Sequence, residues 1–322
     1  RESFLYFNLI CIPYFIARKW CVDIHAIKSC MLGLAFIVLI LSGIAIFVSL
    51  RHWNLYDALG APLGLEVSKI TSYKYREGFL RTSATLGPIH LAAIGFCGVI
   101  MYFYLSATKK KSPLQLLILA AFFMSIILTF SRAPWLVGAG MLALYMAMAY
   151  KSKGLFYLLA GAMGLCAVLM ATGMLDEVMD SFLLKDASNV DYRQRLLELG
   201  FAEIMRNPFF GNIHFMSSPR LQELRQGEGI IDIVNTYLQV GLQFGLVAMV
   251  LFASMVFAWP IAQYRRIKRM RDEQLLGAAQ VYLVVMLGLA AVIFTVSSFG
   301  SGSVFFPLLM FLVGMGHGLR RR

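Results

Sequence analysis

Long apolar runs separated by short polar or basic connections make up most of this chain. A run of roughly 18 apolar residues is long enough to cross a bilayer as a helix. Runs that approach or exceed that length lie near 31–50, 87–106, 114–131, 134–150, 154–173, 236–260, 275–296 and 303–318. An apolar piece at 3–17 is typical of the end of a further helix, and because the chain opens on Arg1 we expect further helices upstream of it. The pattern predicts an all-α fold, a polytopic transmembrane helix bundle with about eight or nine helices in this fragment.

Composition and charge agree with a membrane protein and set its orientation. Of 322 residues, 59% are hydrophobic and 14% are charged, whereas soluble domains carry about 25% charged residues. Basic clusters in short connections mark the cytoplasmic side, and given the spans above every cluster falls on one side: Arg18-Lys19, Lys109-Lys110-Lys111, Lys151 with Lys153, Arg265-Arg266 through Arg271, and Arg320-Arg321-Arg322. The net charge of +12 is therefore mostly a topology signal. It does not indicate nucleic-acid binding, because the basic residues are not gathered in one domain.

The same alternation places three segments outside the cell membrane: a loop at about 51–86, the short corner Ser131–Pro134 and a long periplasmic loop at about 174–235. A loop this long is usually functional. Part of it, from Asp191 to Met205, is predicted to be helical because Leu196, Leu197, Phe201 and Ile204 recur at helical spacing and Asn207-Pro208 ends the pattern. We expect an amphipathic helix on or near the outer membrane surface.

Several function classes have no support in the sequence. The cysteines and histidines lack metal-ligand spacing, and no nucleotide-binding motif is present, so no metal and no cofactor is expected. The spans carry almost no charged residues in their middles, whereas ion-coupled transporters keep ionisable groups there. A polysaccharide or lipid-carrier transporter is therefore a weaker alternative than chemistry at the outer face. A non-catalytic membrane protein that binds glycan through its outer loop is the other alternative.

Candidate site residues collect in the predicted outer segments, each with a plainer alternative. Arg132 stands just before Pro134, which suits the start of a helix; it is either a snorkelling arginine or an anion-binding group beside helix N–H donors. Arg76 and Arg81 are either solvated loop residues or ligand-binding groups. Before the span at 236–260, Asp232 and Asn235 serve either as helix caps or as chemical groups, and they share one face with Gln239 if the helix has already begun.

Four segments, in this order, resemble those of the bacterial O-antigen ligase/polymerase family, multi-pass enzymes that join polysaccharides outside the inner membrane. They are Arg81-Thr82-Ser83-Ala84-Thr85-Leu86-Gly87-Pro88, the corner Ser131-Arg132-Ala133-Pro134-Trp135-Leu136, the stretch from Arg193 to Pro208-Phe209-Phe210-Gly211, and Asn235-Thr236-Tyr237-Leu238-Gln239 followed by Gly241 and Gly245. The match is best over 112–256. It suggests three parts: N-terminal helices and the first outer loop at 1–111, a ligase-related core at 112–256, and C-terminal helices at 257–322.

The resemblance implies transfer of a glycan from an undecaprenyl-diphosphate carrier to a sugar hydroxyl, without metal or cofactor. Its implied partners are this lipid-linked oligosaccharide, a glycan or lipid acceptor, the lipid bilayer and other polysaccharide-export proteins. Arginine suits a diphosphate because its guanidinium donates paired N–H groups to phosphate. We expect Arg132 and Arg193 to bind the diphosphate, and the remaining substrate-binding candidates are Arg81, Arg76, Asn235, Tyr237, Arg220 and Arg225, of which the last two match no motif.

One departure from the family concerns the general base. Ligases of the family that load lipid A carry a histidine just before the Asn-x-Tyr-Leu segment, and this chain has Val234 there. Valine cannot accept a proton. The role of base is therefore vacant or filled by another residue. Asp232 is the nearest carboxylate and our preferred base, and His214 and Glu228 lie in the same loop. A weak base suffices when the leaving group departs readily. The missing histidine favours a polymerase or related exopolysaccharide enzyme over a lipid A ligase.

Overall fold

The computed structural model describes residues 2–53, 74–76, 79–82, 84, 87–107, 110, 112–171, 187–225, 231–297 and 305–320. Five of its helices are long and apolar enough to cross a membrane, and two shorter apolar helices accompany them in this part of the chain. The predicted all-α, polytopic fold is confirmed. Parts of the long loop, 172–186 and 226–230, lie outside the described residues.

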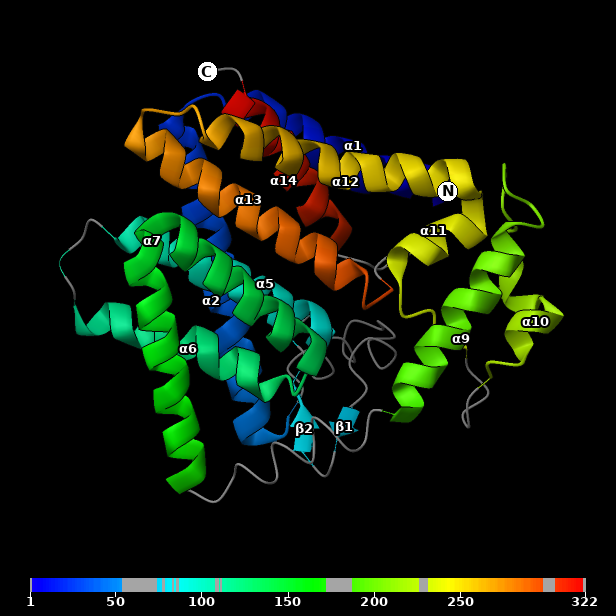
Figure 1. The fold of residues 1–322 in the computed structure, drawn as a ribbon, viewed down its shortest axis with the longest axis horizontal. Helices are drawn as coiled ribbons and strands as arrows, with labels where there is room; N and C mark the ends of the chain where they lie inside the picture. Colours follow the sequence, from blue (N-terminus) through cyan, green and yellow to red (C-terminus); the bar gives the residue numbers. More distant parts are fainter. Residues whose placement is uncertain are drawn as a thin grey trace. The chain divides into compact units, whose positions relative to one another are not determined.

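The helices follow one another along most of the described chain (Figure 1). They are α1 (Glu2–Trp20), α2 (Ile24–Arg51), α5 (Pro88–Ser106), α6 (Pro113–Leu128), α7 (Arg132–Ala171), α9 (Ala187–Ile204), the 3-10 turn η2 (Phe215–Ser217), α10 (Pro219–Gln222), α11 (Thr236–Phe244), α12 (Leu246–Ile267), α13 (Glu273–Ile293) and α14 (Phe305–Arg320). A short antiparallel hairpin, which the hydrophobic pattern did not predict, pairs β1 (Lys74–Arg76) with β2 (Phe79–Arg81).

The chain divides into two compact units. The first contains 1–145, 259–292 and 301–322, and the second contains 146–258 and 293–300. In the first unit α2, α5 and α6 pack against one another, and α1 packs along α14 (Figure 1). The outer face of α2 exposes Leu32, Phe36 and Ile40 at four-residue intervals, as expected of a helix side that contacts lipid.

The long helix α7 doubles back on itself. Lys151 has φ 52° and ψ −132°, which breaks the helical backbone. A Cβ on Gly154 would lie 2.1 Å from the carbonyl oxygen of Met146, although eight residues of straight helix would separate the two by about 12 Å. Two helical segments therefore meet at this point, as predicted from the separate apolar runs at 134–150 and 154–173.

The predicted span at 236–260 is wrong in its outline, because it consists of two helices. Gly245 has φ 90° and ends α11, and α12 begins at the next residue. Only α12 is long enough to cross a membrane. The helix predicted at Asp191–Met205 is confirmed as α9.

The core of the second unit is an apolar cluster between α9, α10 and α11. Its fully or nearly buried members are Leu196, Ile204, Phe215, Leu221, Leu224, Ile233, Leu238 and Leu242. Two glycines let α9 and α11 approach closely: a Cβ on Gly200 would meet Leu238 at 2.9 Å, and one on Gly241 would meet Ile204 at 2.6 Å. The periplasmic-loop segment that the sequence predicted is thus a packed unit with its own core.

Candidate functional site

The corner between α6 and α7 is held by hydrogen bonds from side chains. Phe130 takes a left-handed conformation, with φ 45°, which reverses the chain within three residues. The Trp135 indole N–H donates to the Ile126 carbonyl at 2.9 Å. The Ser131 hydroxyl donates to the Thr129 carbonyl at 3.1 Å; Ser131 is buried and Trp135 is half-buried. The serine and tryptophan of the Ser-Arg-x-x-Trp-Leu segment therefore shape the backbone around Arg132.

The strand β2 and the residue after it are hydrogen-bonded to the same corner. The Arg81 guanidinium donates to the Ser131 hydroxyl at 2.9 Å and to the Thr129 carbonyl at 3.3 Å. The next residue, Thr82, donates its backbone N–H and its hydroxyl to the Leu128 carbonyl, at 3.0 and 2.7 Å. Arg81 thus lies against the backbone that carries Arg132, which is the first residue of α7 and is half-buried.

Arg76 is placed only by its backbone, which pairs with Phe79 across the hairpin; its side chain lies outside the described residues. In the first unit the structure therefore brings Arg81 and the Arg132 corner together.

In the second unit, Asn235 is the N-cap of α11. Its side-chain oxygen accepts from the Leu238 N–H at 3.1 Å, and the residue is 5% exposed. The capping alternative is correct for Asn235. Asp232 does not share a helical face with Gln239, because α11 begins only at Thr236 and Asp232 lies in the extended segment before it.

Asp232 is held in place through its backbone. The Tyr192 hydroxyl on α9 donates to the Asp232 carbonyl at 2.9 Å and accepts from the Asp232 N–H at 3.0 Å. Partial burial raises the pKa of Tyr192, so the hydroxyl stays protonated and keeps its role as donor. Asp232 itself is exposed, so its carboxylate faces solvent while its backbone is fixed.

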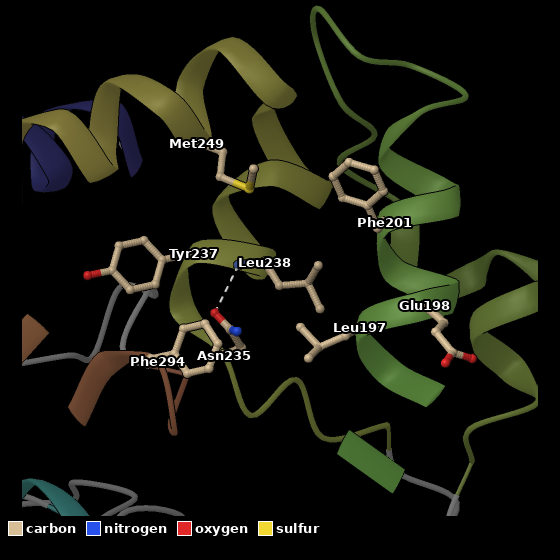
Figure 2. A pocket seen from close by; sticks show the side chains of 8 residues that line it. All are labelled: Leu197, Glu198, Phe201, Asn235, Tyr237, Leu238, Met249 and Phe294. Atoms are coloured by element: carbon tan, nitrogen blue, oxygen red, sulfur yellow. Dashed lines mark hydrogen bonds between the residues drawn. The ribbon is translucent and has the colours of Figure 1, made fainter. Parts of the chain in front are cut away.

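An apolar pocket of about 470 Å³ lies between α9 and α11 (Figure 2). Its lining is Leu197, Glu198, Phe201, Asn235, Tyr237, Leu238, Met249 and Phe294. In Figure 2 the Glu198 carboxylate points away from the apolar side chains, so the inner wall carries little charge. A pocket of this size and composition suits an apolar ligand or the apolar part of one.

Tyr237 contacts three aromatic rings around this pocket. Its ring stacks on Phe257 with centroids 6.2 Å apart, and it contacts Phe252 and Phe294 at 5.4 and 6.4 Å. Burial raises its pKa well above the ordinary tyrosine value. The turn that carries Phe294 is tied to α11, because the Thr236 hydroxyl donates to the Val296 carbonyl at 2.6 Å.

The other predicted arginines lie on the surface of the second unit. Arg193 on α9, Arg220 on α10 and Arg225 are exposed, and none forms a salt bridge with a carboxylate in the described ranges. Arg193 directly follows Tyr192, so it lies one position from the residue that fixes Asp232. In the second unit, Arg193 therefore adjoins Tyr192, which bonds to the backbone of Asp232. Asn235 and Tyr237 line the same pocket.

Sequence reasoning missed Tyr192 and Phe294. Neither carries a local signal, because Tyr192 acts on a residue 40 positions away and Phe294 follows a span that reads as purely apolar. Within the described part of the chain, no three histidine, cysteine, aspartate or glutamate residues gather where they could hold a metal ion.

The turn Pro208–Asn212, which contains Gly211, is hydrogen-bonded to the junction of α11 and α12, which contains Gly245. The Pro208 carbonyl accepts from the Leu246 N–H at 2.6 Å, and the Asn212 N–H donates to the Leu242 carbonyl at 2.8 Å. A Cβ on Gly211 would lie 2.6 Å from the Gly245 nitrogen, and one on Gly245 would lie 2.6 Å from the Phe209 carbonyl oxygen. Both glycines have positive φ, which explains why this pattern needs glycine at both positions.

The corner, the α9 helix and the locked glycine turn all fall within one stretch that matches a family of known proteins. The family model described as O-antigen ligase matches residues 115–253. The resemblance to the O-antigen ligase family expected from the sequence is therefore confirmed over these residues. No protein of curated function matches the chain. This match and the apolar helices together support a multi-pass membrane protein with a domain related to membrane enzymes that ligate or polymerise glycans.

Proposed function

We propose that this chain is an inner-membrane glycosyltransferase that polymerises or ligates undecaprenyl-diphosphate-linked glycan at the periplasmic face. The observation that carries the proposal is the α6–α7 corner within the matched family segment. Side-chain hydrogen bonds hold its backbone, and Arg132 stands at the first position of α7.

The corner suits a diphosphate for two physical reasons. A helix N-terminus presents N–H groups that attract phosphate, and the guanidinium adds paired donors of fixed geometry. In the proposed reaction, a sugar hydroxyl of the acceptor attacks the anomeric carbon of the donor glycan. The bond between that carbon and the diphosphate oxygen breaks, and the lipid diphosphate leaves with the bonding electrons. Arg132 and Arg193 stabilise the charge that develops on it.

The hydroxyl proton goes to Asp232. Tyr192 holds the backbone of Asp232 against α9, and the exposed carboxylate is accessible to an acceptor hydroxyl. The base need act only late in bond formation, because the diphosphate is a good leaving group. Arg81 supports Arg132 through its hydrogen bonds to the α6–α7 corner. Further candidates for donor binding are Arg76, Arg220 and Arg225. The pocket bordered by Tyr237 and Asn235 receives the apolar part of a substrate.

Complementation of a polymer-deficient strain tests the proposal, with glycan chain length as the readout. We expect Arg132→Ala, Arg193→Ala and Asp232→Asn to abolish long polymer at normal protein levels, and Arg132→Lys to restore little, since an ammonium cannot reproduce the paired donors.

The matched controls are Arg195→Ala, on the same helix as Arg193, and Glu223→Gln, an exposed carboxylate after α10. Both are expected to support full-length polymer. Full-length polymer from the three site variants would overturn the proposed roles, whereas single repeat units accumulating on the lipid carrier would identify the reaction as polymerisation.

A further inference from the structure

Helix α9 has two apolar faces, of which only one is buried. Leu196 and Ile204 face the core of the second unit and are each 1% exposed. Leu197, Phe201 and Met205 form a second stripe, and they are 41%, 50% and 53% exposed. Residues four positions apart lie above one another on a helix, so this stripe covers the C-terminal part of α9 and reaches the first residue after it.

The stripe continues into the turn after the helix. Phe209, Phe210 and Ile213 are 70%, 89% and 69% exposed. We call these six exposed apolar side chains the apolar edge: Leu197, Phe201, Met205, Phe209, Phe210 and Ile213. Single exposed apolar residues are ordinary on a protein surface, but a continuous set with three phenylalanines marks a contact with a partner or a membrane.

Backbone contacts fix the position of this edge relative to a membrane-spanning helix. The Pro208 carbonyl is bonded to the N–H of Leu246, the first residue of α12, and Asn212 is bonded to Leu242. α12 is long and apolar enough to cross the membrane. The turn that carries Phe209 and Phe210 is therefore held at the level of the first turn of α12.

The apolar edge also continues the lipid-facing side of the protein. The first turns of α12 expose Val247, Val250 and Leu251, by 50%, 53% and 65%. An exposed apolar stripe on a helix at this level matches the way amphipathic helices lie in a membrane surface, with their apolar side in the boundary between headgroups and acyl chains.

We propose that the apolar edge is inserted into the adjacent leaflet of the lipid bilayer and anchors the second unit at the membrane surface. The partner is the acyl-chain boundary of the membrane itself. Leu197 and Phe201 also line the Tyr237 pocket, so this anchoring places one wall of that pocket in contact with lipid. The anchoring does not depend on the chemistry proposed above.

Spin labelling of the whole chain in lipid nanodiscs tests this directly. A nitroxide is placed at Phe210→Cys or Ile213→Cys, in a background without the five native cysteines. The nanodiscs contain phosphatidylethanolamine and phosphatidylglycerol. Collision of the label with oxygen, which concentrates in the acyl region, is compared with collision with a water-soluble nickel chelate. We expect several-fold greater access to oxygen than to nickel at both positions.

Arg195→Cys is the matched control, because it is exposed on α9 and lies about 200° round the helix from Leu197. It should be accessible to nickel. Nickel access at Phe210 equal to that at Arg195 would show an edge in water and overturn the proposal. Low access to both reagents at Phe210 would show an edge covered by protein, which overturns it equally. Two labelled positions ensure that failure of one variant to fold does not remove the test.

Discussion

The residues of the proposed chemistry lie in two regions, the α6–α7 corner and the α9–α11 unit. Different interactions stabilise these two regions. The corner depends on a few side-chain hydrogen bonds, from Arg81, Thr82 and Trp135, to backbone carbonyls or to Ser131. The α9–α11 unit depends on close packing, with an apolar cluster and glycines at its contact points. A corner of this kind is sensitive to the loss of a donor, and a packed unit is sensitive to added volume.

The largest effect is expected from volume added at the glycine lock. Gly245→Ala places a methyl group 2.6 Å from the Phe209 carbonyl oxygen at φ 90°. Strained backbone alone costs about 1–3 kcal/mol, and overpacking adds about as much again. We expect a marked loss of folded protein, measured as yield and thermal unfolding in detergent.

Gly140→Ala is the control, since a Cβ there meets nothing within 4 Å; its unfolding temperature should stay near that of the parent chain. An unchanged unfolding temperature for Gly245→Ala would mean that the turn at Pro208–Gly211 is not locked to the start of α12.

This lock also shows where sequence patterns stop being informative. The spans, the α9 helix and the cap at Asn235 follow from local periodicity and local hydrogen-bonding preferences, and they could be predicted. The break at Gly245 could not, because the apolar run continues through it and the start of α12 is bonded to a distant residue: the Leu246 N–H donates to the Pro208 carbonyl, 38 residues earlier. The Arg81 contact with Ser131 and the Tyr192 contact with Asp232 span 50 and 40 residues, and no periodic pattern encodes such pairs.

An intermediate effect is expected from removing a donor at the corner. Arg81→Ala deletes the hydrogen bonds to Ser131 and Thr129, so the backbone that carries Arg132 loses its outer support. A hydrogen bond from a charged group contributes about 1.5–3 kcal/mol. We expect roughly a tenfold or greater loss of polymer per unit of protein, which corresponds to about 1.4 kcal/mol, together with a modest fall in unfolding temperature.

Arg81→Lys should recover part of this loss, because an ammonium can donate to one of the two oxygens but cannot span both. Arg51→Ala provides the comparison, as it removes an exposed arginine at the end of α2. If Arg51→Ala lowers polymer as much as Arg81→Ala does, the effect comes from surface charge and the corner contact has no special role.

The smallest effect is expected at Tyr192, which joins the packed unit to Asp232 by polar contacts. Tyr192→Phe keeps the ring and removes the hydroxyl that bonds both backbone groups of Asp232. A neutral hydrogen bond contributes about 1 kcal/mol, so we expect a small fall in stability and a several-fold loss of transfer.

The pKa of Tyr192 is raised by burial, so its stabilising contribution is present below the ordinary tyrosine pKa of about 10 and declines as pH rises past that value. The difference in stability between the parent chain and Tyr192→Phe should therefore shrink as the pH rises above about 10, measured by thermal unfolding at each pH. A difference that grows with pH would contradict the role of this hydroxyl as a donor, and a difference of zero at pH 7 would mean that packing alone holds Asp232 against α9.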